Sequence, residues 1–557
     1  MSTPSPALAQ SLQSAQALAQ AGRVAEAERL YAQIVQADPA YADAWFLYGT
    51  VALQSGRPAE AIPRFEAALR LNRRAVPYLF NAALAHQAVG ALDTAADFFR
   101  KTLRADPKLA QAHNSLGAVL QAQGNAKEAA FAFKKALALQ PKYGRAHYNL
   151  GTVLHGQCKF ADAALSFREA IKFEPTLAQA HTNLGVMLQE LGDLPGAAEA
   201  YAQALVLNPQ DAETLNNRGT LLRETGDFPA AAQSFAAAIE TRPQFAEAHR
   251  NKALLHLMRG DYAEGWRDYA WRWQCPDLGP TRRPFTQASW DGQASNAPVL
   301  VWGEQGVGDE ILYAGMMPDL AARGIDVIWE ADARLVSLLQ RSCPTVRVIA
   351  RATPPDPLAA TATYQVPAAD LGQFFRALAS DFPRDRLAYL KADPQRAADL
   401  RAQCGVQPGQ RLVGLSWRSY NAVFGAHKST DLADWAPLLA MPGLRFVNLQ
   451  YGDTARERAG QPLIQPDIDL RDDLDGVAAL TSACDLVITV SNTTAHLAGA
   501  LGRPVWVLVP AGGGKLWYWG HGSAQSPWYP SATIFRQAAD GSWAEPIAAM
   551  ATRLAAP

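Results

Sequence analysis

The stretch "AHNSLGAVLQAQGNAKEAAFAFKKALALQP", residues 112–141, decides the fold of the first half of the chain. It has small residues at Gly117 and Ala129, an aromatic residue at Phe133 and a proline at Pro141. The same residue types return every 34 residues on both sides of this stretch. The small residue recurs at Ala27, Ala61, Ala95, Ala129, Ala163, Ala197, Ala231 and Gly265, and the aromatic residue recurs four positions later at Tyr31, Phe65, Phe99, Phe133, Phe167, Tyr201, Phe235 and Tyr269.

Helix packing explains this spacing. Small residues let two antiparallel helices approach, an aromatic ring fills the gap between them, and proline ends the second helix because it has no N–H to donate. The period and the signature resemble the tetratricopeptide repeat, in which each unit is a pair of helices. The resemblance implies an α-helical superhelix of about eight repeats over residues 1–275.

A second series at the same spacing consists of asparagines on the first helix of each expected pair. Asparagine has middling helix propensity and is costly to bury alone, so packing does not require it there. Its amides either bind the backbone of an extended peptide or form hydrogen bonds between neighbouring repeats. The O-linked N-acetylglucosamine transferases have a similar ladder on the concave surface of their repeats, and this resemblance implies a protein acceptor bound there. The series, in which Ser115 replaces one asparagine, is Asn81, Asn149, Asn183, Asn217 and Asn251.

The composition excludes several classes of protein. Lys and Arg (51) balance Asp and Glu (52) to a net charge of -1, which gives no general attraction to nucleic acid or anionic lipid. The five cysteines form no C-x-x-C pair, so neither a disulfide framework nor a metal site is predicted. No apolar run is long enough to span a membrane and the N-terminus lacks the pattern of a secretory signal, so we expect a cytoplasmic protein.

The second half of the chain has a different texture, with short apolar runs that alternate with helical stretches. Apolar runs bounded by turns and separated by helices predict buried parallel strands. A charged helical stretch near 373–410 divides them into two Rossmann-like lobes, 298–385 and 386–557, after a linker over 276–297. Spacing alone predicts two α/β lobes, and two such lobes that face one another form the architecture called GT-B. The runs are 298–302, 326–330, 346–350, 411–417, 445–452, 485–490 and 504–510.

The stretch "VWGEQGVGDEILYAG", residues 301–315, leads from an expected strand through a glycine-rich turn into an expected helix. It lacks a Walker motif, and Ile311 stands where a dinucleotide fingerprint needs glycine or alanine. The stretch resembles the first loop of the lipopolysaccharide heptosyltransferases, in which an aspartate is the proposed general base. The resemblance implies that the corresponding residue here is Asp309 and that the lobe over 298–385 is the acceptor side.

Two roles are open for Asp309. An acceptor hydroxyl must lose its proton as it attacks the anomeric carbon, and a carboxylate at the lip of a cleft can take that proton. Alternatively, Asp309 caps the helix, because the helix dipole favours an acid in the first turn. Gly306 and Gly308 would let an acceptor approach the backbone, while Glu310 and Glu304 are weaker alternatives for the base.

The stretch "DLVITVSNTTAHLAGALGRPVWVLVP", residues 485–510, predicts a buried strand that runs into the start of a helix. The free N–H groups of a helix start form an anion site. The stretch is similar to the donor-binding segment of heptosyltransferases, which implies that 386–557 is the nucleotide-sugar side. That family usually has an aspartate facing the donor sugar where this chain has Asn492, so an identical donor does not follow. The residues expected at the donor are Ser491, Asn492, Thr493, Thr494 and His496, of which His496 is equally well read as a structural helix residue.

Cations near the departing phosphate would lower the barrier without a metal ion. Arg418 and Lys428 follow the strand at 411–417, where the heptosyltransferases bind donor phosphate with a basic residue; Lys428 is the first choice, and a solvated loop charge is the alternative. Lys515 lies in a long aromatic segment and could meet an acidic donor. The neighbouring residues 517–519 (Trp, Tyr and Trp) would either stack on the donor or clamp the lobes by packing.

Together these features predict a metal-independent protein glycosyltransferase that transfers sugar from a nucleotide-activated donor to Ser or Thr of a protein held by the repeats. The chain looks most like the repeat-bearing flagellin glycosyltransferases of stalked alphaproteobacteria, which implies flagellin as acceptor and a CMP-activated nonulosonic acid as donor. No cofactor other than this substrate is expected. Two rival hypotheses are a repeat-based adaptor with a degenerate, non-catalytic α/β half, and a glycosyltransferase that acts on a glycan.

Overall fold

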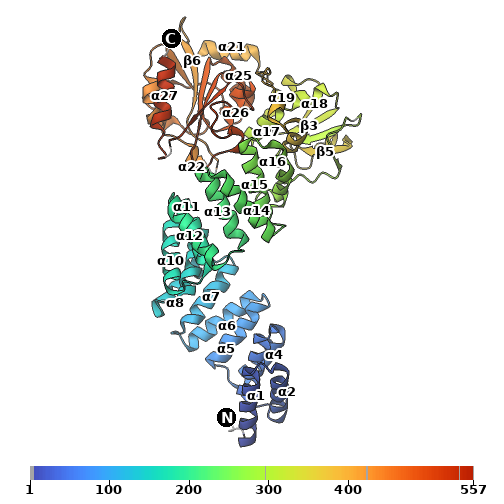
Figure 1. The fold of residues 1–557 in the computed structure, drawn as a ribbon, viewed down its shortest axis with the longest axis vertical. Helices are drawn as coiled ribbons and strands as arrows, with labels where there is room; N and C mark the ends of the chain where they lie inside the picture. The colour runs from blue at the N-terminus through green and yellow to red at the C-terminus, as the bar shows by residue number, and fades with distance from the viewer. Residues whose placement is uncertain (1–4, 295, 422–424, 513, 539, 556–557) are drawn as a thin grey trace. The chain divides into compact units, whose positions relative to one another are not determined.

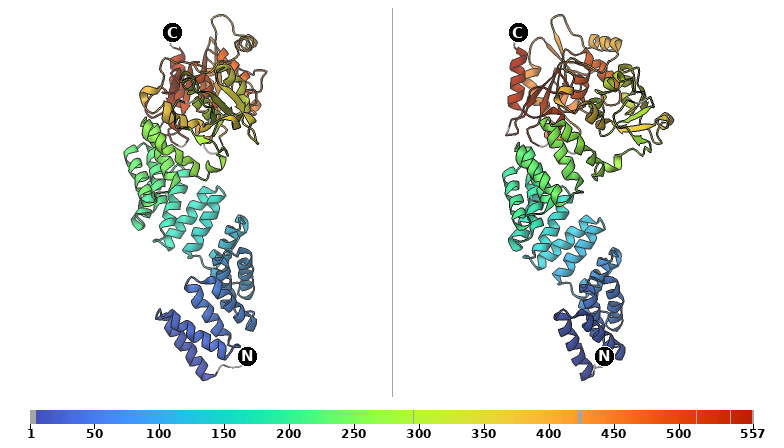
Figure 2. Two further views of the ribbon diagram at one scale, coloured as in Figure 1. Left: turned by 90° about the vertical axis from the view of Figure 1, so that its right-hand side faces the viewer. Right: turned by 45° about the vertical axis from the view of Figure 1, so that its right-hand side comes forward.

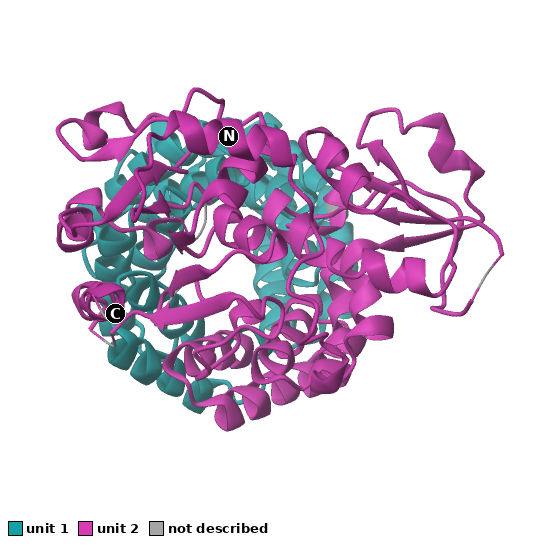
Figure 3. Cartoon of the chain, turned by 90° about the horizontal axis from the view of Figure 1, so that it is seen from above, with its two compact units in different colours: residues 1–214 teal, residues 215–557 magenta. Residues whose placement is uncertain are grey.

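The computed structural model describes residues 5–294, 296–421, 425–512, 514–538 and 540–555, so the first four residues of the expected repeat domain lie outside the described part. The chain divides into two compact units, Met1–Thr214 and Leu215–Pro557, coloured separately in Figure 3. Every helix or strand found in the described residues of the first unit is a helix, and both β-sheets belong to the second unit. No helix in the described residues is both long enough and apolar enough to cross a membrane.

Sixteen helices in tandem confirm the predicted repeats, and Figure 1 labels most of them. They are α1 (Pro6–Gln20), α2 (Val24–Ala37), α3 (Ala42–Gln54), α4 (Pro58–Leu71), α5 (Val76–Ala88), α6 (Leu92–Ala105), α7 (Ala110–Ala122), α8 (Ala126–Leu139), α9 (Gly144–Gly156), α10 (Phe160–Phe173), α11 (Ala178–Glu190), α12 (Leu194–Leu207), α13 (Ala212–Thr225), α14 (Phe228–Thr241), α15 (Ala246–Arg259) and α16 (Tyr262–Tyr269).

The packing of the small and aromatic positions follows the predicted logic. Phe133 of α8 is fully buried against α7, where a Cβ added to Gly117 would lie only 2.6 Å from the ring. Gly151 has the same relation to Phe167, at 2.8 Å. Glycine at this position therefore lets the two helices of a pair approach closely, and Figure 2 shows the resulting antiparallel pairs within the first unit.

The last helix pair packs into the α/β half of the second unit. Trp266 of α16 is buried and its indole N–H donates to the carbonyl of Arg376, at 2.9 Å. Its ring also meets Trp517 edge to face, with the ring centroids 5.4 Å apart. A Cβ on Gly372 would collide with this indole. One hydrophobic cluster consequently joins α14–α16 to both sheets, which explains why the second unit begins at Leu215, before the end of the repeats.

The first sheet is entirely parallel, with the strand order β1-β5-β2-β3-β4. Its strands are β1 (Ala288–Ser289), β2 (Val299–Trp302), β3 (Val327–Ala331), β4 (Arg347–Ala350) and β5 (Tyr364–Pro367). The associated helices are η1 (Ala270–Gln274), η2 (Gly279–Thr281), α17 (Val307–Ala314), α18 (Met317–Ala322), η3 (Ala333–Leu335), α19 (Val336–Ser342), η4 (Pro357–Thr361), η5 (Ala368–Leu371), α20 (Gly372–Phe375) and η6 (Ala379–Asp381).

The segment expected to be a linker, 276–297, contributes to this sheet. Its β1 pairs with β5, and the following Trp290 is buried and donates its backbone N–H to Gln365, at 2.9 Å. Gln365 in turn accepts the indole N–H of Trp302 at 2.7 Å, so a polar residue can occupy the buried strand β5. We call the α/β part that contains this sheet the first lobe.

The second sheet is also parallel, with the order β11-β10-β9-β6-β7-β8. In chain order this is the 3-2-1-4-5-6 arrangement of dinucleotide-binding folds. The strands are β6 (Arg411–Ser416), β7 (Leu444–Asn448), β8 (Leu463–Ile464), β9 (Leu486–Val490), β10 (Val505–Val509) and β11 (Ala532–Arg536). The helices are α21 (Pro394–Gln403), α22 (Gly425–Lys428), η7 (Leu432–Trp435), α23 (Ala436–Leu439), α24 (Ala455–Arg458), α25 (Leu474–Ala483), α26 (Thr493–Ala500), η8 (Trp517–Trp519) and α27 (Ala544–Ala555).

Helices cover both faces of this second sheet, as Figure 1 shows for α27 on one side of β6 and α25 and α26 on the other. Parallel strands buried on both faces account for their nearly continuous apolar sequences. The coarse prediction of an α/β half with parallel sheets is confirmed. We call the part that contains this sheet the second lobe.

Candidate active site

Each lobe has a topological switch point, where the strand order reverses and the loops after two neighbouring strands diverge. In the first lobe this point lies between β2 and β5, and in the second lobe between β6 and β9. Ligands of open α/β sheets bind outside the carboxyl ends of the strands at such points. Every residue predicted from the stretches 301–315 and 485–510 follows one of these four strands.

The two switch points meet through the starts of α17 and α26. A Cβ added to Gly308 in α17 would lie 3.0 Å from the ring of His496 and 3.7 Å from the Cα of Thr493. Glycine is therefore needed at 308 because a neighbouring helix, rather than open solvent, fills the space beside it. This contact brings the acceptor loop predicted in the first lobe next to the donor segment predicted in the second.

Asp309 is the third residue of α17 and is half-buried. Its carboxylate accepts the backbone N–H of Gly306 at 3.2 Å, so it satisfies one of the free N–H groups at the helix start. Burial raises the pKa of Asp309 to about 6, with Glu304 also raising it and Lys428 lowering it. The geometry thus gives Asp309 the contact of a first-turn cap and also a pKa suited to a general base near neutral pH.

The two weaker alternatives to Asp309 are both held by arginines. Glu310 is 1 % exposed and forms an ion pair with Arg351 inside the first lobe. Burial raises its pKa to about 7. Glu304 is also buried and binds the guanidinium of Arg272 at 2.8 Å. Asp309 is therefore the one carboxylate of the predicted three that has no arginine partner among the described residues.

Lys428 ends α22, after β6, and is only 4 % exposed. Its amine makes no hydrogen bond or ion pair within the described part of the chain, and burial lowers its pKa while the nearby Asp309 raises it. Arg418 differs, because its guanidinium binds Glu457 at 2.5 Å and the hydroxyl of Tyr420 at 2.9 Å. Of the two predicted cations, Lys428 is the more available to an anionic ligand.

Asn492 caps α26. Its amide oxygen accepts the backbone N–H of Thr494 at 3.0 Å, and its amide nitrogen donates to Ser416 at 2.8 Å and to the carbonyl of Arg418 at 3.1 Å. An aspartate could accept the first of these bonds but could not donate the other two. The departure from the family pattern thus has a local structural reason, and a contact of Asn492 with the donor stays a prediction.

The other residues around the start of α26 divide into bonded and open groups. Ser491 is buried and accepts the indole N–H of Trp519 at 2.7 Å. The hydroxyls of Thr493 and Thr494 make no hydrogen bond to the described residues, and both residues line a cavity. These two hydroxyls, with the helix start behind them, are the free donors of the predicted anion site.

His496 is buried in an aromatic cage. Its Nδ1 lies 2.9 Å from the hydroxyl of Tyr529, and its ring stacks on Trp519 with the centroids 5.3 Å apart. Burial lowers the pKa of His496 to about 3, and the charge of Lys428 lowers it further, so the imidazole is neutral at physiological pH. These contacts favour the structural reading of His496.

The aromatic segment after β10 packs against the repeats and the lobe. Trp517, Tyr518 and Trp519 are all buried, which supports the clamp rather than a stacking surface for the donor. Lys515 is half-buried beside Arg223, Glu224 and Arg536, and burial lowers its pKa. The structure places Lys515 among residues of α13 and β11, away from the cavity residues named below, so its donor contact stays a prediction.

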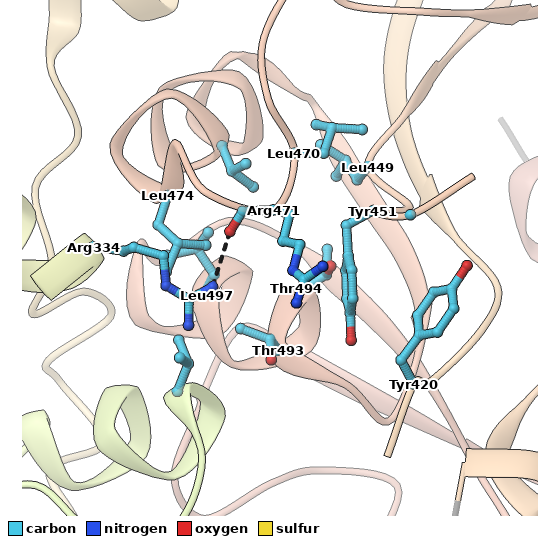
Figure 4. A pocket seen from close by; sticks show the side chains of 13 residues that line it. Arg334, Tyr420, Leu449, Tyr451, Leu470, Arg471, Leu474, Thr493, Thr494 and Leu497 are labelled. Carbon is cyan, nitrogen blue, oxygen red and sulfur yellow. Dashed lines mark hydrogen bonds between the residues drawn. The ribbon is translucent and has the colours of Figure 1, made fainter. Parts of the chain in front are cut away.

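A cavity of about 440 Å³ opens between the two lobes (Figure 4). Figure 4 shows Arg471 extending into it beside the ring of Tyr451, with Thr493 and Thr494 nearby and the hydrogen bond from Arg334 to the carbonyl of Arg471 drawn as a dashed line. None of the aromatic and arginine residues that line this cavity was among the residues predicted from the sequence. They are Arg334, Tyr420, Tyr451 and Arg471.

A signal for the missed residues exists in the sequence. Tyr451 and Gly452 are the last two residues of the run predicted at 445–452; in the structure they follow β7, at the same sheet edge as the loops after β6 and β9. The rings of Tyr420 and Tyr451 lie 4.9 Å apart. An aromatic pair at this edge is suited to a planar ring such as a nucleobase.

The asparagine ladder forms hydrogen bonds within the array. Asn149 donates to Asn114 at 3.0 Å, and Asn251 donates to Asn216 at the same distance. In the other three positions the amides contact Tyr148, Asn216 or their own helix. Hydrogen bonds of this kind are expected if the asparagines join neighbouring repeats. All five side chains are nevertheless only half-buried and so remain partly accessible, and peptide binding stays a prediction.

Comparisons with known proteins support the repeats. Models of the tetratricopeptide repeat match residues 12–62, 49–110, 114–178 and 216–270, and a further model of the same repeat matches 178–211. The chain is also similar to protein FlbA of Caulobacter vibrioides, with 36% identity over 318 residues, 52% of this chain. The matched part is 52% of FlbA, so the chain spans about half the length of this curated relative.

Solved structures show likeness over shorter parts. YrrB, described as a tetratricopeptide repeat protein with an unusual peptide-binding site, is 26% identical with a TM-score of 0.30, covering 33% of this chain and 95% of YrrB. PilF of Pseudomonas aeruginosa is 22% identical with a TM-score of 0.36, covering 38% of this chain and 96% of PilF. The helix pairs and the repeat matches together establish that the N-terminal part, to about residue 270, consists of tetratricopeptide repeats.

Proposed function

We propose that the protein is a glycosyltransferase that moves a sugar from a nucleotide-activated donor to a Ser or Thr hydroxyl of a protein bound by the repeats. The acceptor oxygen attacks the anomeric carbon and Asp309 takes the hydroxyl proton. The bond from that carbon to the donor phosphate breaks, and the nucleotide leaves with the negative charge. Lys428 and the start of α26 stabilise this charge, where preorganised donors give the largest help.

The observation that carries the proposal is the contact between the starts of α17 and α26, which brings Asp309 of the first lobe close to the donor segment and to the charge of Lys428 in the second. Each group acts on the pKa of the other, and Lys428 has no other charged partner among the described residues. A buried, unpaired lysine costs stability, so a fold retains it where an anion binds. The neighbouring carboxylate has the raised pKa of a candidate base.

The cavity between the lobes supports the donor half of the reaction. Its volume of about 440 Å³ lies in the range of small-molecule sites. Tyr420 and Tyr451 offer rings for a nucleobase, and Arg471 offers a cation near Thr493 and Thr494. This arrangement would seat the base at the tyrosines and the phosphates at the start of α26.

The acceptor half of the proposal rests on the repeats, since tetratricopeptide repeats are protein-interaction modules. Flagellin as acceptor and a CMP-activated nonulosonic acid as donor are the finer parts of the proposal. They rest on the resemblance of the chain to the repeat-bearing flagellin glycosyltransferases. A cytoplasmic location is part of the same proposal, because activated nucleotide sugars are made there.

A panel of nucleotide sugars tests the proposed function. Purified protein is mixed with each donor, and release of nucleotide is measured with and without candidate acceptor protein. We expect turnover of one donor class and a loss of at least 100-fold for Lys428→Met, whose buried cation is removed. Lys391→Met, which removes an exposed lysine of the same unit, is the matched control. Absence of both binding and turnover across the panel would favour a non-catalytic adaptor.

A second candidate acceptor is a glycan, and the hydrogen bonds of the asparagine ladder favour it. If the amides serve only to join repeats, then they are not available to form hydrogen bonds with the backbone of a bound peptide. The variant Asn183→Ala tests this point, because the amide contacts Tyr148 at a long 3.4 Å and little structure is lost. Weaker binding of a protein acceptor would support peptide binding by the asparagines, whereas unchanged transfer would support a glycan as the acceptor.

A further inference from the structure

A buried ionic cluster joins the end of the repeats to the acceptor loop. Arg272, in the turn η1 after the last repeat helix, donates from Nε and Nη2 to both carboxylate oxygens of Glu304, each at 2.8 Å. The same Nη2 lies 2.7 Å from Asp370, which follows β5. Arg272 is 0 % exposed. We call Arg272, Glu304 and Asp370 the Arg272 cluster.

The cluster holds both sides of the switch point in the first lobe. Glu304 lies in the loop after β2 and also accepts the backbone N–H of Ala369, at 3.1 Å, from the loop after β5. One guanidinium thus ties together the two loops between which a ligand would bind. Asp309 follows Glu304 by only five residues, in the first turn of the helix α17 that this loop enters.

The last repeat aromatic takes part in this connection. The guanidinium of Arg272 lies over the ring of Tyr269, 4.5 Å from its centroid, and Nη1 donates to the carbonyl of Tyr269 at 3.1 Å. The hydroxyl of Tyr269 accepts from the side-chain amide of Gln305, at 3.0 Å. Gln305 has a positive φ of 63°, which is unfavourable for a residue with a side chain. Such strain persists only where surrounding contacts fix the loop.

Packing alone does not explain the cluster. Apolar residues of the same volume would be as stable as a buried ion pair or more so, whereas removal of one partner leaves an uncompensated charge. The nearby contact of Trp266 with Trp517 shows that aromatic rings also pack the last repeat against the lobes. The buried charges of the Arg272 cluster therefore indicate a need for a defined geometry.

We propose that Arg272 is a positioning residue: it fixes the loop 303–306 against the end of the repeats and thereby holds Asp309 beside Lys428. The role of Asp309 as a base rests on the proposed function. The connection of the last repeat to the loop 303–306 through Arg272 does not. It makes the last repeat a part of the active site framework. If acceptor binding displaced that repeat, the Arg272 side chain would transmit the displacement to the loop that holds Asp309.

Several ionisable groups face Asp309 and must be considered in its titration. Without Arg272, the uncompensated charge of Glu304 would raise the pKa of Asp309 further, because Glu304 already acts in that direction. Lys428 acts in the opposite direction and would be unchanged. The remaining groups around the carboxylate are Tyr269 and Tyr313, Tyr518 and Tyr529, and the neutral His496 beside Gly308.

The test compares Arg272→Met with Arg267→Met in the full chain. Arg267 lies in α16 and pairs with Glu264 on the surface, so its variant removes an arginine from the same region without touching the cluster. Amide hydrogen exchange of the peptide 303–310 is measured first, because it needs no substrate. We expect exchange at least 10-fold faster in Arg272→Met and unchanged in Arg267→Met.

Turnover gives the second readout. With the donor found by the panel, kcat of Arg272→Met should fall at least 10-fold with the donor Kd within about twofold, and the acidic limb of its pH profile should move to higher pH. A milder variant, Glu304→Gln, keeps the volume of the side chain and serves if Arg272→Met does not fold; it should speed exchange in the same peptide.

The outcomes are distinguishable. Unchanged exchange of 303–310 in a folded variant that breaks the cluster would overturn the positioning role. Faster exchange with unchanged kcat would likewise overturn it, because the loop would then be held for no catalytic purpose. Absence of turnover by the wild-type protein with every donor would instead reject the proposed function, and the exchange data would still decide whether Arg272 holds the loop.

Discussion

The two compact units use buried residues in different ways. In the first unit the buried core consists of small, aliphatic and aromatic residues, and its charged side chains remain at least partly exposed, as in the ion pair of Arg23 with Glu26. In the second unit charges are buried beside apolar residues. Among the described residues, every buried side chain of Arg, Lys or Glu belongs to the second unit: Arg272, Glu304, Glu310, Glu330, Arg376 and Lys428.

This difference distinguishes the apolar contacts that stabilise a fold from the buried charges that a functional site needs. A repeat is stabilised by contacts with its neighbours, and apolar packing is sufficient for them. Buried charges contribute little or cost stability, so their concentration in one unit indicates a function there. The carboxylates whose pKa is raised show the same division, because Asp309, Glu310 and Asp370 all lie in the second unit.

The largest expected effect on stability is in the first unit. Phe133→Ala removes a fully buried ring from α8 and should lower the free energy of unfolding by about 3–5 kcal/mol. Gly117→Ala should cost about 1–3 kcal/mol, because its methyl group would overlap that ring. Urea unfolding of the full chain, followed by circular dichroism, measures both.

Gly156→Ala is the matched control for these two changes. It lies at the end of α9, and a Cβ there would have no neighbour within 4 Å. Alanine is the better helix former, so this variant should be neutral or slightly more stable. A loss of stability at 156 as large as at 117 would show that packing against the aromatic ring is not what the repeats depend on.

A smaller effect, which depends on pH, is expected from Asp309 in the second unit. Its folded pKa of about 6 lies above the ordinary 3.8, so its contribution to stability is present below pH 4 and is lost as pH rises through 6. Asp309→Asn should therefore be more stable than wild type by about 1–3 kcal/mol at pH 8, and this gain should disappear at pH 4.

Urea unfolding at the two pH values measures this gain. Asp326→Asn, which changes an exposed aspartate of the same unit that pairs with Arg347, is the control. A variant at 309 that is less stable than wild type at pH 8 would mean that the carboxylate acts mainly as a helix cap. In that case the burial of the Asp309 carboxylate would stabilise the second unit and would not indicate a functional site.

The smallest effect concerns one turn of the first unit. Cys158 has a positive φ of 57°, where the same position of the neighbouring repeats is Gly124 or Gly192. A side chain in this left-handed region costs about 1–2 kcal/mol. Cys158→Gly should consequently raise the free energy of unfolding by about 1 kcal/mol in the same urea experiment, and a lower value would mean that the cysteine side chain makes a compensating contact.

The repeats could be predicted from sequence because each determinant is local and recurs. Gly117 and Phe133 lie on adjacent helices, and the glycines at 49, 151, 185 and 219 make the same contact with the aromatic residue 16 positions later. The seven apolar runs of the second half likewise correspond to β2, β3, β4, β6, β7, β9 and β10. Parallel strands buried on both faces have apolar sequences that are easily recognised.

The remaining strands lacked that signal. In β5 the central Gln365 is polar, and its side chain forms hydrogen bonds with Trp302 and Ser289, which are far away in the sequence and cannot be recognised from a local pattern. The strands β1 and β8 have two residues each, too few for any periodicity. Missing β5 also hid Asp370, which follows it, and with it the Arg272 cluster.

Residues of the candidate site that belong to a sequence motif could be predicted. Residues that reach the site only through tertiary contacts could not. Asp309, Lys428 and Thr493 come from loops after strands that the sequence revealed, and the structure brings these loops together. Arg334 and Arg471 reach the cavity from opposite lobes, so their proximity depends on how the lobes pack. Arg272 lies in a segment that sequence analysis assigned to the repeats.

The most direct test of the central claim is a single-turnover measurement with Asp309→Asn and saturating donor. We expect glycosylated product to form at least 100-fold more slowly than with wild type, because the base is lost, while the donor Kd from calorimetry stays within about twofold. Asp326→Asn should behave as wild type. Transfer by Asp309→Asn at the wild-type rate would show that Asp309 is not the catalytic base.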